Sequence, residues 1–168
     1  MTDQPFRSGF ACFVGRPNAG KSTLTNALVG QKIAIASSKP QTTRHVVRGI
    51  VTRDSGQLVL IDTPGLHRPR TLLGERLNDL VRETWSEVDI VGVCLPCDQR
   101  IGPGDRYIVS QIAELSNRPL LVALATKTDL VSKERVLSHL VDISALADEL
   151  GIQWALTQIG RASCRERV

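Results

Sequence analysis

Hydrophobic and polar positions follow two alternating patterns along most of the chain. Short apolar runs indicate buried strands, and they cover residues 9–15, 44–52, 56–62, 89–95, 118–129 (ending in a polar loop) and 152–156. Longer segments with apolar residues at helical spacing indicate helices, and they cover residues 20–30, 74–88, 103–115 and 132–151. Ser132 is the expected N-cap of the last helix, and Gly151 marks its end.

The order of these elements predicts an α/β fold. Strands that alternate with helices form a mostly parallel sheet with helices on both faces. The second and third strands are separated only by the turn signal Asp54-Ser55-Gly56, so we expect a hairpin and one antiparallel strand. Ligands of such sheets bind at the carboxyl ends of the strands. The polar loops after the first, third and fifth strands are therefore expected to face one site.

The composition narrows the class of protein. With 168 residues, 42% hydrophobic and 23% charged, the chain is an ordinary globular domain. No apolar run approaches the about 20 residues that span a bilayer, and the first ten residues lack a signal-peptide pattern, so a cytoplasmic protein is expected. The last ten residues supply half of the net charge of +4. The other residues therefore carry too little positive charge to indicate a nucleic-acid-binding surface on this chain.

Two of the four cysteines, Cys94 and Cys97, have the C-x-x-C spacing of redox and zinc sites. A zinc site needs four ligands, and no second pair lies at metal spacing. Cys94 ends an apolar strand, which favours burial, with a redox or metal role as the alternative.

The strongest motif is GRPNAGKS, residues 15–22, between the first strand and the first helix. It matches G-x-x-x-x-G-K-[ST], whose glycines and backbone N–H groups wrap a phosphate at a helix N-terminus. Lys21 is predicted to reach the β- and γ-phosphates, and the Ser22 hydroxyl to ligate Mg²⁺. The expected phosphate-binding residues here are Gly15, Asn18, Ala19, Gly20, Lys21, Ser22 and Thr23.

A second motif, Asp62-Thr63-Pro64-Gly65, follows the third strand. Asp62 can hold Mg²⁺ through water, and the N–H of Gly65 can contact the γ-phosphate. Alone this tetrapeptide is typical of a turn, but one hairpin after a P-loop it indicates a sensor of the last phosphate. Leu66 stands where the best-known GTP switches carry a glutamine that orients the attacking water.

The loop after the fifth strand reads Thr126-Lys127-Thr128-Asp129. A carboxylate accepts two hydrogen bonds from guanine, whose N1–H and exocyclic amine have no equivalent pair in adenine. Asp129 therefore predicts guanine specificity and disfavours an ATPase, and the Lys127 stem can pack on the base. By itself the tetrapeptide is equally compatible with a solvated loop.

Residues 37–45, SSKPQTTRH, form a polar loop between the first helix and the second strand. A threonine there could ligate Mg²⁺ in a segment that orders with the γ-phosphate.

In this order and spacing, the motifs resemble those of the Era family of bacterial GTPases, within the TrmE-Era-EngA group. The resemblance rests on GRPNAGKSTLTNALVGQKIAIAS, KPQTTRH, IDTPGLHRP and IGPGDRYI, and it covers nearly all of residues 9–156. It implies a P-loop GTPase domain that hydrolyses GTP slowly, with Thr43 as the Mg²⁺-binding threonine. It also implies that Asn18 helps to bind K⁺ beside the phosphates. The expected catalytic residues are Lys21, Thr43 and Asn18.

The resemblance further implies that the intact protein acts in small-subunit ribosome assembly, with a KH domain that binds 16S ribosomal RNA. This chain departs from the family pattern at Thr126, where asparagine is usual; a threonine can still hydrogen-bond within the loop, so we expect weaker positioning of the base rather than lost specificity. The usual Ser-Ala loop is missing, because Ser144 lies in a helical pattern.

The expected domain organisation has three parts. Residues 1–8 are an N-terminal tail, residues 9–158 are a GTPase domain that is incomplete at its C-terminus, and residues 159–168 resemble a translated sequencing adapter. The KH domain is absent from the sequence. A native basic tail is the alternative for the last segment. Alternatives for the function are a GTP- or GDP-binding module without turnover, or another TrmE- or EngA-type GTPase.

Overall fold

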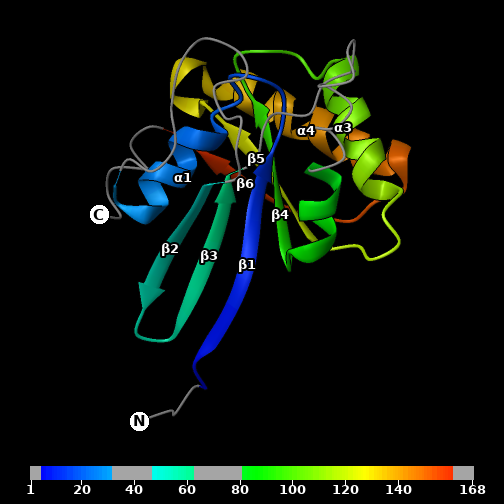
Figure 1. Ribbon diagram of the computed structural model, residues 1–168. Coiled ribbons are helices and arrows are strands. Elements are labelled where there is room, and N and C mark those ends of the chain that lie inside the picture. Colours follow the sequence, from blue (N-terminus) through cyan, green and yellow to red (C-terminus); the bar gives the residue numbers. More distant parts are fainter. Residues whose placement is uncertain (1–4, 32–46, 63–80, 161–168) are drawn as a thin grey trace.

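The fold is built on a single six-stranded sheet. The computed structural model describes residues 5–31, 47–62 and 81–160. The strands are β1 (Arg7–Val14), β2 (Val47–Arg53), β3 (Gly56–Asp62), β4 (Ile90–Pro96), β5 (Leu120–Thr126) and β6 (Ala155–Ile159). Their order is β2-β3-β1-β4-β5-β6, and all neighbours are parallel except the β2–β3 hairpin. Figure 1 shows β2 running against β3 and β1, which confirms the predicted mostly parallel sheet with one antiparallel strand.

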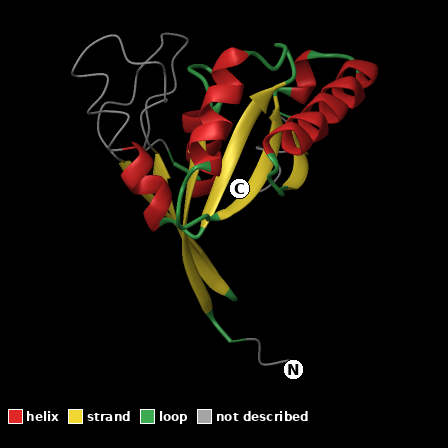
Figure 2. Cartoon of the chain, turned by 90° about the vertical axis from the view of Figure 1, so that its right-hand side faces the viewer, coloured by secondary structure: helices red, strands yellow, loops and turns green. Residues whose placement is uncertain are grey.

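Helices cover both faces of the sheet, as predicted (Figure 2). They are α1 (Lys21–Val29), α3 (Pro103–Ala113) and α4 (Lys133–Leu150), with a short 3₁₀ turn, η1, at Thr128–Leu130. The helix expected at 74–88 is seen as a helical segment from 81 to 87, and its earlier residues lie outside the described part. None of the helices in the described ranges combines the length and apolarity needed to cross a bilayer.

The core has two halves, one on each face. On one face, Leu24 of α1 packs with Ala11, Phe13 and Leu60 of the sheet. On the other face, the segment that contains Trp85 packs with α3, α4 and the alternate strand residues, including Val91 and Val93. Because successive strand side chains point to opposite faces, continuous apolar strands supply both halves.

Both ends of α4 form as the sequence predicts. The cap after Gly151 explains why the last strand begins later than predicted. The Ser132 hydroxyl accepts the Arg135 N–H, and Gly151 ends the helix with a positive φ of 61°. The N–H of Ile152 then bonds to the Ala147 carbonyl, so Ile152 completes the helix cap and is buried. The prediction of a strand at 152–156 is therefore wrong in its bounds, because β6 starts at Ala155 and continues to Ile159.

Candidate functional site

The loop between β1 and α1 has a backbone that few residue types could adopt. Gly15 has φ 148°, and a Cβ there would lie 2.7 Å from the Cys94 carbonyl oxygen, so only glycine fits. Asn18 and Gly20 also have positive φ, at 63° and 98°. Alternation of such residues with ordinary ones is typical of loops whose successive N–H groups bind one anion, and this loop leads directly into the N-terminus of α1.

Lys21, the first residue of α1, lies inside this loop and is only 8% exposed. Its Nζ donates to the carbonyl oxygens of Gly15 at 3.0 Å and Arg16 at 2.9 Å. The ammonium group is thereby held at the start of this loop. Since burial removes much of its hydration, a phosphate that binds at the loop meets a cation with a strengthened electrostatic attraction.

Thr126, the last residue of β5, joins the end of this strand to the loop after β1. Its Oγ1 donates to the Ala19 carbonyl at 2.8 Å, although β4 lies between the two strands. Thr126 is 5% exposed and Ala19 is 1% exposed, so the bond is shielded from water. The hydroxyl therefore bonds outside its own loop, and the expectation of weaker positioning without loss of guanine specificity stays a prediction. The short side chain reaches the predicted phosphate loop and fixes the two loops relative to each other.

The predicted guanine-recognition loop continues into η1. Lys127 caps this turn in the left-handed conformation, with φ 58°, and Asp129 lies within the turn with an exposed side chain. Gly160, just after β6, passes so close that a Cβ there would lie 2.9 Å from the Thr128 hydroxyl and 3.5 Å from the Asp129 nitrogen. Because β6 is parallel to β5, it delivers its end to the same edge of the sheet, whereas the expectation that residues 159–168 are a non-native tail stays a prediction.

The predicted Mg²⁺ ligands are only partly described. Ser22 follows Lys21 in the first turn of α1, with the exposed Thr23 beside it. Asp62 is the last residue of β3, paired with Phe13 of β1, so its backbone ends beside the phosphate loop. Thr43 and Gly65 lie outside the described residues, as does the Asp62 side chain. Hydroxyl and carboxylate oxygens are hard donors of the kind that Mg²⁺ prefers, and the Mg²⁺ site stays a prediction.

An ion pair between the partly exposed Arg16 and the buried Asp105, which the sequence analysis does not predict, holds the start of the loop after β1. Arg16 Nε lies 2.7 Å from Asp105 Oδ1, and the Asp105 side chain is 1% exposed. The other carboxylate oxygen accepts the Gly102 N–H at 2.8 Å, and Arg16 Nη2 reaches the Arg100 carbonyl at 3.3 Å. The only local signal was the acidic residue in the first turn of α3, which indicates a helix cap and not a partner 89 residues away.

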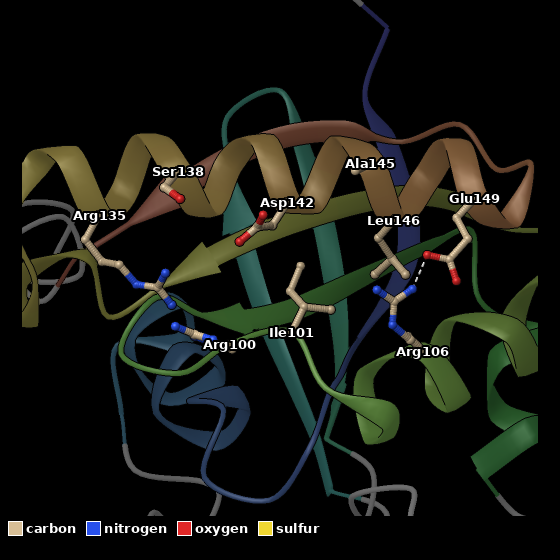
Figure 3. A pocket seen from close by; sticks show the side chains of 9 residues that line it. All are labelled: Arg100, Ile101, Arg106, Arg135, Ser138, Asp142, Ala145, Leu146 and Glu149. Carbon is tan, nitrogen blue, oxygen red and sulfur yellow. Dashed lines mark hydrogen bonds and ion pairs between the residues drawn. The ribbon is translucent and has the colours of Figure 1, made fainter.

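The described part of the chain has a cavity of about 410 Å³ away from these motifs (Figure 3). Its walls come from α4, the start of α3 and the preceding loop, and an ion pair between Arg106 and Glu149 closes one end. None of the predicted site residues lines it. The open surface at the ends of β1, β3 and β5 is therefore the candidate site.

The cysteines within residues 5–31, 47–62 and 81–160 are buried core residues. Cys12, Cys94 and Cys97 are fully buried and free of disulfides. Burial, with Cys94 nearby, raises the pKa of Cys12 to about 12, and burial also raises the pKa of Cys97. A thiol that stays protonated is a poor nucleophile and metal ligand, so the structure favours packing for the C-x-x-C pair.

The left-handed loop before α1, the buried lysine held by it and the Thr126 bond that joins it to the end of β5 lie at one edge of this sheet and define a P-loop GTPase fold. The chain belongs to the family described as 50S ribosome-binding GTPase, whose model matches residues 10–127.

Two relatives carry the name GTPase Era. The protein of Streptomyces coelicolor A3(2) is 64% identical over 149 residues, which is 89% of this chain and 47% of the relative. That of Nocardioides sp. JS614 is 66% identical over the same coverage. The chain thus spans about half the length of the curated relatives it matches.

Solved structures of Era share the fold. Era in complex with MgGDPNP and nucleotides 1506–1542 of 16S ribosomal RNA superposes with a TM-score of 0.82 at 27% identity, covering 92% of this chain and 51% of that one. An Aquifex aeolicus Era variant bound to GDP and aluminium fluoride superposes with a TM-score of 0.80 at 27% identity, covering 91% of this chain and 51% of that one.

Proposed function

We propose that this chain is a guanine-nucleotide switch domain that binds GTP and GDP with Mg²⁺ and hydrolyses GTP. The observation that carries the proposal is the 2.8 Å bond from Thr126 to Ala19, which joins the loop expected to read the base to the loop expected to hold the phosphates. A nucleotide bound at this edge would have its two ends held by one rigid unit. The family membership and the likeness to nucleotide-bound Era structures support the same function.

In this proposal each residue has a defined task. Phosphate oxygens are bound by the Lys21 ammonium and by backbone N–H groups, Gly65 contacts the last phosphate, and the other phosphate-binding residues are Gly15, Asn18, Ala19, Gly20, Ser22 and Thr23. Asp129 accepts the guanine N1–H and amine. Ser22 and Thr43 ligate Mg²⁺ and Asp62 holds it through water; the ion supplies charge neutralisation between the β- and γ-phosphates.

Base choice is tested by displacing fluorescent GDP from the 168-residue chain with GDP, ADP and xanthosine diphosphate. We expect GDP to displace and ADP not to, and Asp129→Asn to shift the preference toward xanthosine diphosphate, whose 2-oxo group accepts from an amide. Asp54→Asn, in the exposed β2–β3 turn, makes the same charge change far from the site and is the matched control. An unchanged preference in Asp129→Asn would contradict the assignment.

Turnover is tested separately by single-turnover phosphate release with Mg²⁺. GDP binding without phosphate release would identify a binding module instead of an enzyme.

We further propose that Asn18 helps to bind K⁺ beside the phosphates, where a cation offsets charge that develops during hydrolysis. Its support is the placement of Asn18 in the phosphate loop, with an exposed side chain on a left-handed backbone. Phosphate release should be faster in K⁺ than in Na⁺, and Asn18→Ala should abolish the difference. Equal rates in the two salts would eliminate this mechanism.

For the longer protein to which such a domain belongs, we propose binding to 16S ribosomal RNA in small-subunit assembly, through a KH domain. The name of the relatives and the Era complex with 16S ribosomal RNA support it. This chain alone should then bind an RNA of that sequence much more weakly than a relative of full length, as measured by fluorescence anisotropy.

A further inference from the structure

The side chain of Asp98 holds the ammonium group of Lys127. Asp98 Oδ2 lies 3.0 Å from Lys127 Nζ, and the two side chains are 28% and 27% exposed. Asp98 belongs to the loop after β4, whereas Lys127 belongs to the loop after β5. No motif in the sequence includes Asp98.

The sheet itself brings the two residues together. Pro96 and Thr126 are paired at the ends of β4 and β5, and the Cys97 N–H donates to the Thr126 carbonyl at 2.9 Å, one residue beyond the strand. Asp98 and Lys127 therefore follow directly in the two loops that leave β4 and β5 side by side.

Asp98 is anchored on both sides by its neighbours. Cys97 before it is fully buried. Gln99 after it donates its N–H to the Pro96 carbonyl at 3.2 Å and accepts from Arg135 of α4 at 3.2 Å. The Asp98 carboxylate is thus presented from a fixed turn, and not from a loop that could follow the lysine.

Lys127 is fixed at its other end by its backbone. Its left-handed conformation is closed by the Leu130 N–H, which donates to the Lys127 carbonyl at 3.1 Å. With the Cα held by η1 and the Nζ held by Asp98, the flexible methylene stem is restrained at both of its ends. An apolar stem of this kind offers a surface on which a flat base can pack.

We propose that Asp98 is a positioning residue for the guanine base: by pairing with the Lys127 ammonium it holds the Lys127 stem in place as the surface on which the base packs. This inference rests on the proposed guanine-nucleotide function. Preorganisation of this kind improves affinity because the side chain has less freedom to lose when the ligand binds. Asp98 acts on the face of the base, whereas Asp129 acts on its edge.

The test measures dissociation constants for GDP and for inosine diphosphate, which lacks the exocyclic amine that Asp129 is proposed to read. Wild type is compared with Asp98→Asn, with Lys127→Met, which keeps an apolar stem without the charge, and with the double variant. Asp54→Asn controls for the change in net charge, and melting temperatures of the free proteins control for folding.

We expect Asp98→Asn to raise the dissociation constants of both nucleotides by the same factor, about twofold to fivefold, because the ion pair is partly exposed. Asp54→Asn should bind like wild type. In the Lys127→Met background, Asp98→Asn should have no further effect, because the pair is already lost. Asp98→Glu should keep most of the affinity.

Three results would overturn the inference: Asp98→Asn binding like Asp54→Asn, an equal loss in the Lys127→Met background, or a larger loss for GDP than for inosine diphosphate, which would mean that Asp98 acts through Asp129. A wild-type chain that does not prefer GDP to ADP would instead overturn the proposed function itself.

Discussion

Removing the Thr126 hydroxyl tests the contact that joins the two nucleotide loops. Thr126→Val keeps the shape of the side chain and deletes only the donor to the Ala19 carbonyl. Both residues are at least 95% buried, so water does not readily replace the lost donor. An unsatisfied buried carbonyl costs about 1–3 kcal/mol of folding free energy. In a domain of this size that lowers the melting temperature by about 2–4 °C per kcal/mol, or about 2–12 °C in all.

The assay is urea unfolding together with a fluorescent GDP titration. GDP affinity should fall with stability, because Ala19 belongs to the loop proposed to hold the phosphates. Thr126→Ser retains the hydroxyl and should recover most of both quantities, although it loses a buried methyl group. If Thr126→Val unfolds at the same urea concentration as wild type, with an unchanged slope, the hydroxyl contributes nothing and the reasoning is refuted.

Three other groups give direct predictions. Lys21→Ala removes a charge-assisted phosphate contact worth about 1.5–3 kcal/mol, so labelled GDP should bind about tenfold to a hundredfold more weakly; wild-type affinity would exclude this loop as the phosphate site. Arg16→Ala leaves the Asp105 carboxylate buried without its ion pair. Because Arg16 is partly exposed, we expect the free energy of unfolding, measured in urea, to fall by about 2–3 kcal/mol, and adding Asp105→Asn should partly restore it. An Arg16→Ala variant as stable as wild type would contradict the importance of this pair. Burial lowers the pKa of His139 from 6.5, so the unfolded chain takes up a proton before the folded one, and stability should fall as the pH drops below about 6.5. His139→Gln, whose amide can still donate to the Leu95 carbonyl, should show a smaller difference between urea midpoints at pH 7.5 and 5.5; an equal difference would assign the pH dependence to other groups.

Much of the fold could be predicted because its signals are local. Apolar runs, helical spacing and the cap residues Ser132 and Gly151 act within a few positions, and the prediction of α4 with both of its ends is confirmed. The error at β6 arose because Ile152 looks like a strand residue but completes a helix cap, a distinction that depends on where the cap bonds fall. The sequence also predicts the loop between β1 and α1 as the phosphate-binding loop, because the glycines and the lysine of its motif lie within eight consecutive residues.

Periodicity and short motifs are local properties of the sequence, and they were enough to predict the element types, the mostly parallel sheet and the residues expected to bind a guanine nucleotide. The tertiary structure alone decided which distant residues support them. Thr126 meets Ala19 across 107 positions, Arg16 meets Asp105 across 89, and Lys127 meets Asp98 across 29. The strand order places the ends of β1, β4 and β5 side by side, and no periodicity within one segment encodes a contact between the loops that leave different strands.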